Sequence, residues 1–235
     1  MNLSTLLKVL EYIDENPTNV VDFGLHGEAL LHPQAVEFIS VAKHYKKTRS
    51  LYIHTNGTML TEEMCRKLMD IGINVEVSIH TEKSLLGYKR MVDANTQGTY
   101  RVQGSCLSAC APKLKKWMEN VGITEHHLNS PSGKLLVLTG MHNWALDAPR
   151  ENNYKDKCHF IQGGRCVVKW DGKIYACCFD FSGTNHIGHI DNFPALVHKP
   201  ETYKLCDSCS PAWVNWNKAL ETWSVSDYYA NFGDS

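Results

Sequence analysis

The stretch VVDFGLHGEALLHP, residues 20–33, decides the fold class of this chain. It opens with a β-branched and aromatic run over residues 20–25, which is typical of a short buried strand. The chain then becomes polar at His26-Gly27-Glu28. Pro33 is expected to occupy the first position of a following helix, where its missing N–H costs no hydrogen bond. The stretch therefore predicts a strand, a polar turn and a helix.

The same strand–helix unit recurs along the first third of the chain, and the middle is less regular. We expect further strands at residues 51–54, 74–79 and 134–139, a helix that Thr61 caps and Gly72 ends, and helices at residues 3–13 and 112–120. Residues 97–110 show no clean period, and no element is expected there. Repeated units of this kind form a parallel sheet with right-handed crossovers, so the fold class is α/β.

Composition excludes several functional classes. The 235 residues have a formal net charge of −1, which does not favour a nucleic-acid partner. The longest apolar runs fall well short of the roughly 20 residues that span a bilayer, and the first residues lack the pattern of a signal peptide. Nine cysteines, an odd number, indicate reduced thiols and metal binding rather than a disulfide framework. We therefore expect a cytoplasmic protein without a membrane partner.

Polar residues follow each of the first three predicted strands, at His26-Gly27-Glu28, His54-Thr55-Asn56-Gly57 and Ser78-Ile79-His80. Parallel sheets bind ligands at the carboxyl ends of their strands, so these endings are expected to line one pocket. Two alternatives stay open. The endings are also compatible with ordinary strand-to-helix turns, in which Asn-Gly supplies the turn. The three histidines are compatible with a mononuclear metal site.

Four motifs occur in an order that resembles the radical S-adenosylmethionine (radical SAM) superfamily. They are GEALLHP at residues 27–33, TNGTML at 55–60, VSIH at 77–80 and LTGMHNW at 138–144. The first three are similar to the family's GEPLLHP, TNGT-L and VSID patterns. This resemblance implies that Gly27 and Glu28 hold the amino group of S-adenosylmethionine and that Ser78 contacts its carboxylate or ribose. Asn56 is a further candidate.

The chain departs from the family pattern in three places. Ala29 replaces the proline of GEP, and His80 replaces the aspartate of VSID. The family's CxxxCxxC loop, which holds the radical-generating iron–sulfur cluster, has no counterpart before residue 27. Cys106 and Cys110 have a CxxxC spacing but follow the third predicted strand, and Cys65 is expected to be a small buried side chain.

Six cysteines fall in the last third of the chain: Cys158, Cys166, Cys177, Cys178, Cys206 and Cys209. Cys206 and Cys209 form a CxxC pair, whose tight turn brings two sulfurs to one metal. Asp171-Gly172 is a strong hairpin signal, and that hairpin would present Cys177 or Cys178 at its end. This pattern predicts a metal site, for which iron–sulfur and zinc remain alternatives.

The cysteine pattern resembles the twitch and SPASM extensions of radical SAM proteins. The resemblance implies one auxiliary four-iron, four-sulfur (4Fe–4S) cluster held by Cys158, Cys177, Cys206 and Cys209, with Cys178 as an alternative to Cys177. Cys166 is left without a role.

The resemblance implies a partial (β/α) barrel over residues 1–150 and a small cysteine-rich β-hairpin extension with an aromatic tail over residues 151–235. Such a chain is a truncated, split or degenerate radical SAM enzyme, inactive in S-adenosylmethionine cleavage by itself. A peptide or protein substrate, or a partner chain that completes the barrel, is then expected. The alternative is a non-catalytic binding or electron-transfer protein in which the bound metal, iron–sulfur or zinc, stabilises the fold.

Overall fold

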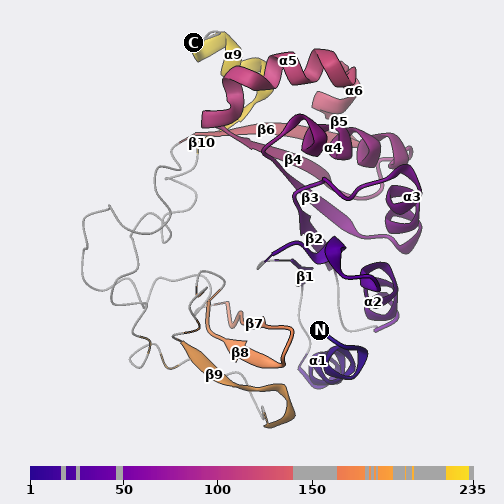
Figure 1. Cartoon of the computed structure of the whole chain (residues 1–235), viewed down its shortest axis with the longest axis vertical. Coiled ribbons are helices and arrows are strands. Elements are labelled where there is room, and N and C mark those ends of the chain that lie inside the picture. Colours follow the sequence, from indigo (N-terminus) through magenta and orange to yellow (C-terminus); the bar gives the residue numbers. More distant parts are fainter. Residues whose placement is uncertain are drawn as a thin grey trace. The chain divides into compact units, whose positions relative to one another are not determined.

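The computed structural model describes residues 1–16, 20–24, 27–45, 50–139, 163–177, 180, 183, 185–192, 199, 203 and 221–232 (Figure 1). The chain divides into two compact units. One combines Met1–Asn16 with Gly140–Leu220, and the other combines Pro17–Thr139 with Glu221–Ser235.

The larger unit is built on one mixed sheet. Its parallel strands follow one another in sequential order: β1 (Val20–Phe23), β2 (Ser50–Thr55), β3 (Asn74–Ile79), β4 (Val102–Leu107) and β6 (Gly133–Thr139). Two antiparallel strands, β5 (Asn129–Ser130) and β10 (Glu221–Ser224), pair with β6. Each new parallel strand is therefore added on the same side of the one before it. In a doubly wound sheet, by contrast, the strand order reverses part-way along the chain.

Helices connect the strands: η1 (Ala29–Leu31), α2 (Ala35–Lys43), α3 (Glu62–Ile71), α4 (Glu82–Ala94), η2 (Ser108–Cys110), α5 (Ala111–Val121) and α6 (Glu125–Leu128). A last helix, α9 (Val225–Phe232), follows β10. Helices α2, α3 and α4 lie on the same face of the sheet (Figure 1). The Thr61 side chain accepts from the Met64 N–H at 3.2 Å, and Gly72 ends α3 in the left-handed conformation, as the sequence predicted.

The two faces of the sheet differ in polarity. Alternate side chains of β2 and β3 are buried toward the helices, and on that side they are mostly apolar: Leu51, Ile53, Val75, Val77 and Ile79. Full burial of one such side chain contributes about 1.5–3 kcal/mol, so this face holds much of the core. The other face carries half-buried polar side chains, which is unusual for parallel strands because these are commonly apolar on both faces.

Two of the sequence predictions differ from the structure. Pro33 does not open a helix: it lies in a turn, and α2 begins at Ala35. The Ala35 N–H donates to the carbonyl oxygen of His32 at 3.0 Å, which closes that turn before the helix starts.

The second difference is strand β4, which falls within the stretch for which no element was expected. Its helix-facing positions include Gly104 and Cys106, and its other positions include Gln103 and Ser105. Small and polar residues therefore hide the alternation on which strand prediction depends. Register with β3 and β6 fixes the strand instead.

The smaller unit contains α1 (Leu3–Glu15) and a sheet of β7 (Val167–Val168), β8 (Lys173–Tyr175) and β9 (His186–His189), which η4 (Ile190–Asn192) follows. Lys8 of α1 forms an ion pair with Asp191 of η4. Strands β7 and β8 are antiparallel, and Gly172, with φ of 83°, lies between them. The predicted boundary at residues 150 and 151 lies outside the described residues and stays a prediction.

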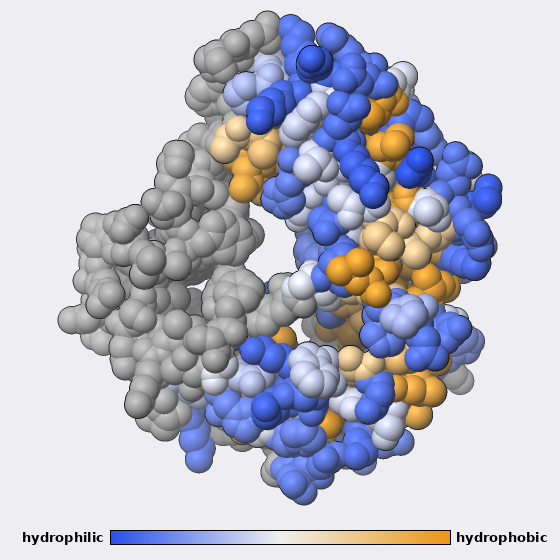
Figure 2. Space-filling view, viewed as in Figure 1, coloured by the Kyte–Doolittle hydropathy of each residue, from blue (hydrophilic) through white to orange (hydrophobic). Residues whose placement is uncertain are grey.

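The described surface is mostly polar. Hydrophilic residues predominate on the face seen in Figure 2, and apolar residues occur there in small groups. Leu31 and Met59 are among the exposed large apolar side chains. In the described part of the chain, no helix has the length and apolar character needed to cross a membrane.

Candidate functional site

The turn after β1 and the end of β2 are joined through one carboxylate. Glu28 Oε1 accepts from the Thr55 hydroxyl at 2.8 Å and from the Leu30 N–H at 3.1 Å. Glu28 Oε2 accepts from the Asn56 N–H at 2.6 Å. Both oxygens of Glu28 are therefore engaged within the protein, and they hold the two strand endings together.

The Asn56-Gly57 turn is shaped by its own side chain and by helix α4. Asn56 Oδ1 accepts from the Thr58 N–H at 2.9 Å, which forms a local turn of the type that Asn favours. A Cβ added at Gly87 of α4 would lie 2.1 Å from the Gly57 carbonyl oxygen. The absence of a side chain at Gly87 thus lets α4 pack directly against this turn.

The backbone at Gly27 is open. Gly27 is exposed, has φ of 89°, and a Cβ added there would meet no heavy atom within 4 Å. Gly24, just after β1, differs because an added Cβ would lie 2.5 Å from the His54 carbonyl oxygen. Gly24 therefore serves close packing of the strands, whereas Gly27 leaves its backbone accessible to a ligand.

The four predicted cofactor-binding residues lie at one edge of the sheet. Asn56 is in direct contact with Glu28, the neighbour of Gly27. The pairing of Thr55 with Val77 brings Asn56 and Ser78 to adjacent positions on neighbouring strands. Ser78 is half-buried on the polar face of β3.

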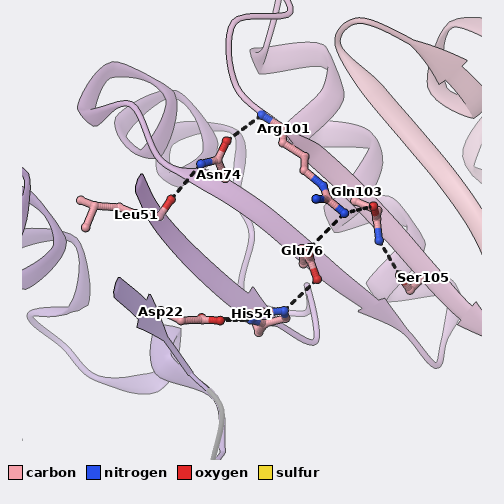
Figure 3. A network of polar contacts seen from close by, with 8 residues as sticks. All are labelled: Asp22, Leu51, His54, Asn74, Glu76, Arg101, Gln103 and Ser105. Carbon is pink, nitrogen blue, oxygen red and sulfur yellow. Dashed lines mark hydrogen bonds and ion pairs between the residues drawn. The ribbon is translucent and has the colours of Figure 1, made fainter. Parts of the chain in front are cut away.

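A polar network crosses the sheet just below this edge (Figure 3). His54 Nδ1 lies 2.8 Å from Asp22 Oδ2, and His54 Nε2 lies 2.7 Å from Glu76 Oε2. Burial alone lowers the pKa of the imidazole, but hydrogen bonds to both carboxylates outweigh it and raise the pKa of His54 to about 10. His54 is therefore a fixed cation at neutral pH, which bridges β1, β2 and β3.

The network continues through β3 and β4. Arg101 lies 3.4 Å from Glu76 Oε1 and also donates to Gln103, whose amide donates to the Ser105 hydroxyl at 3.4 Å. The hydrogen bond from His54 is the main cause that holds the pKa of Glu76 below its usual range. Charges therefore alternate in sign across the sheet, from Asp22 to Arg101.

This network was not expected from the sequence. Its signal was the alternation of polar residues along β2 and β3, at Tyr52, His54, Asn74, Glu76 and Ser78. Because successive side chains of a strand point to opposite faces of the sheet, this alternation indicates that one face of the parallel sheet is polar.

The mononuclear metal alternative is not favoured at His54, because both of its ring nitrogens are occupied by carboxylates. His80 is exposed, and His26 lies outside the described residues.

Of the four predicted cluster ligands, the structure describes Cys177, which lies two residues beyond the end of β8. Cys158, Cys206 and Cys209 lie outside the described residues, as does Cys178. Among the described residues, there is no group of three or more His, Cys, Asp or Glu side chains that could hold a metal ion. Cys166 directly precedes β7, and the pairing of Val167 with Tyr175 brings it to the same open end of the hairpin as Cys177.

Comparison with known proteins supports the fold. No protein-family model matches the chain. A tungsten-containing aldehyde ferredoxin oxidoreductase cofactor-modifying protein from Pyrococcus furiosus is 33% identical over 76 residues, which are 32% of this chain and 21% of that protein. The match thus spans about a fifth of that relative.

Solved structures resemble nearly the whole chain. BtrN in an open conformation has a TM-score of 0.51 at 16% identity, over 97% of this chain and 86% of that one. Tagged anSMEcpe with bound AdoMet has a TM-score of 0.58 at 14% identity, over 92% and 75%. Native anSMEcpe with bound AdoMet and a peptide gives 0.54 at 13%, over 92% and 76%. These neighbours are radical SAM enzymes, and the mixed α/β fold with its parallel sheet is consistent with theirs.

Proposed function

We propose that this chain is an iron–sulfur protein of the radical SAM/SPASM type. It binds S-adenosylmethionine at the edge that carries Gly27, Glu28, Asn56 and Ser78, and one auxiliary 4Fe–4S cluster through Cys158, Cys177, Cys206 and Cys209. The observation that carries this proposal is the sequential order of parallel strands, with a glycine turn fixed by Glu28 at their carboxyl ends. We infer that this sheet is part of a (β/α) barrel.

The residues at the edge fit the polar end of S-adenosylmethionine. The exposed backbone of Gly27 can offer hydrogen bonds to an amino or carboxylate group, and its positive φ allows that approach. The Glu28 carboxylate already accepts three hydrogen bonds from the protein. Glu28 therefore orients the turn, and the backbone beside it meets the ligand.

The first cysteine in these 235 residues is Cys65, so a CxxxCxxC loop ahead of the turn is not among them. When S-adenosylmethionine and a reduced open-iron cluster are bound together, they supply radical chemistry. We expect this chain by itself not to cleave S-adenosylmethionine, and any radical-generating cluster to depend on cysteines outside these residues. The chain's own part is to orient the ligand and exclude water.

The auxiliary cluster is supported by spacing and by the hairpin. Cys177 lies two residues beyond the end of β8, and Cys206 and Cys209 have the spacing of a chelating pair. Zinc is the competing metal, since four thiolates bind it equally well.

The test is to purify the chain anaerobically, reconstitute it with iron and sulfide, and measure iron, zinc and the visible spectrum. One cluster gives about four irons per chain. A colourless protein with stoichiometric zinc contradicts the iron–sulfur assignment. Binding of S-adenosylmethionine is measured separately by calorimetry, so that the two sites are tested independently.

The second candidate is a degenerate relative that keeps the cluster as a structural staple or electron relay. It requires only the cysteines in the last third of the chain. Dithionite and S-adenosylmethionine are added to the reconstituted protein, and deoxyadenosine is measured. Formation by this chain alone contradicts the degenerate alternative, and formation only with a second polypeptide supports a split enzyme.

A peptide or protein substrate is proposed by analogy with the peptide-bound neighbour, and a partner chain that completes the barrel remains the alternative. The cysteine content further supports a reducing compartment, the cytoplasm.

A further inference from the structure

Two cysteines outside the proposed cluster lie together at the end of β4. Cys106 is the next-to-last residue of that strand and is fully buried on its helix-facing side. Cys110 is half-buried and is the N-cap residue of α5. The short η2 turn (Ser108–Cys110) joins the end of β4 to the start of α5, so that only three residues separate the two cysteines, and Cys110 is close enough to Cys106 to raise the pKa of its thiol.

Both thiols are placed for contact by their surroundings. The Cys106 thiol also lies 3.4 Å from the Leu107 carbonyl oxygen, which orients it near the end of the strand. The Cys110 side chain makes no capping hydrogen bond to the first turn of α5, a described helix that carries Pro112 near its start. Both cysteines are free thiols in this structure, and a disulfide between them needs their Cα atoms to lie within about 7 Å of each other.

We propose that Cys106 and Cys110 form a reversible disulfide, a redox-sensitive thiol pair at the edge of the sheet. Such pairs in reducing compartments are commonly catalytic or redox-sensing. A disulfide that closes so short a loop removes little conformational entropy from the unfolded chain, so it would stabilise the fold only slightly. The half-buried Cys110 is the member that an oxidant can reach.

The reaction balances with a small disulfide such as oxidised glutathione. The Cys110 thiolate attacks one glutathione sulfur, forms a mixed disulfide and releases the first glutathione as a thiolate, which takes up a proton. Cys106 then loses its proton and attacks the Cys110 sulfur, which releases the second glutathione. The protein loses two hydrogen atoms and oxidised glutathione gains them.

The second step is the slower one at neutral pH. Burial, and then the neighbouring Cys110, raise the pKa of the Cys106 thiol to about 12, so little of it is thiolate. The mixed disulfide at Cys110 should therefore accumulate first and resolve faster as the pH increases.

The pair lies close to the proposed ligand edge. Cys106 pairs in register with Ile79, and the preceding residues Ser105 and Ser78 pair with each other. A cross-link at this place ties the end of β4 to the start of α5, one strand away from Ser78.

Peptide mapping tests the proposal directly. Cleavage after Arg101 and Lys113 gives a peptide, residues 102–113, that contains these two cysteines and no others. The full-length protein is incubated with oxidised and reduced glutathione in varying ratios, alkylated and digested. We expect the oxidised peptide to lose two hydrogen atoms, to resist alkylation at both cysteines, and to recover both thiols with dithiothreitol.

Two variants and one internal control make the result decisive. With Cys110→Ser, Cys106 should resist modification as Cys65 does, which is likewise fully buried. With Cys106→Ala, Cys110 should stop at the mixed disulfide; retention of the wild-type circular dichroism spectrum verifies the fold. Separate glutathionylation of both cysteines in the wild type, or a cross-link of either one to another cysteine, overturns the proposal.

Discussion

His54 Nε2 lies 2.7 Å from Glu76 Oε2, while its other ring nitrogen faces Asp22 on the neighbouring strand. One imidazolium thus joins three parallel strands on the face of the sheet that the helices do not cover (Figure 3). Strand β1 is short and lies at the end of the described sheet. The bridge therefore stabilises the strand that leads into the Gly27–Glu28 turn.

The His54 bridge should make stability depend on pH in the alkaline range. The pKa of His54 is raised from 6.5 to about 10 in the folded protein. Its contribution is therefore complete below about pH 6.5 and is lost as the pH rises through 10. His54→Gln should lower the free energy of unfolding by about 1–2 kcal/mol at pH 7, after allowance for solvent screening. The measurement is urea unfolding from pH 6 to 10.

His80→Gln is the matched control, because His80 is exposed. The difference between wild type and His54→Gln should shrink toward pH 10, whereas the control should track the wild type throughout. A difference that stays constant over this range would contradict the assigned role of the His54 proton.

Glu28→Gln tests whether the carboxylate organises the proposed ligand edge. The amide has one acceptor oxygen where the carboxylate has two, so one of the three N–H and O–H donors loses its partner. We expect a loss of about 1–3 kcal/mol in unfolding free energy and weaker binding of S-adenosylmethionine in calorimetry. Glu119→Gln on the exposed face of α5 is the control. Unchanged binding with reduced stability would assign Glu28 to folding alone.

Gly87→Ala tests the close packing of α4 on the Asn56-Gly57 turn. The new methyl group would lie 2.1 Å from the Gly57 carbonyl oxygen, so the helix or the turn must move. Overpacking of this kind costs about 1–3 kcal/mol, which outweighs the gain of up to about 1 kcal/mol expected from placing Ala in a helix. Thermal unfolding measures the result, with Lys83→Ala at an exposed position of the same helix as control. A more stable Gly87→Ala protein would show that the packing is looser than described.

Cysteine variants distinguish the ligands of the proposed cluster. Cys177→Ser should reduce the iron content after anaerobic reconstitution, because the thiolate is a far better iron ligand than a hydroxyl. Cys65→Ser changes a buried thiol of α3 that is remote in sequence from the extension, and it should keep wild-type iron. Cys166→Ser is informative as well, since Cys166 lies at the same end of the hairpin as Cys177. Loss of iron in that variant would add Cys166 to the ligand set.

The sequence by itself determined the strand–helix alternation and the class of the fold. Strands β2, β3 and β6 and the ends of α3 lie within a residue or two of their predicted bounds, because apolar alternation and the Thr61 and Gly72 caps are local signals. The sequence also marked Gly27, Glu28 and Asn56 as candidates, since polar residues follow these strands; the structure brings Glu28 and Asn56 into contact, and their role in ligand binding stays a prediction.

Only the tertiary structure decided the features that depend on neighbours across the sheet. Strand β4 carries Gly104 and polar residues, and its pairing with β3 and β6 defines it. Strand register likewise places Glu28 against Thr55 and Asn56, and His54 against Glu76. A turn after β4 places Cys110 near Cys106. Local propensity does not encode such contacts, because each depends on which strands become neighbours and in which register they pair.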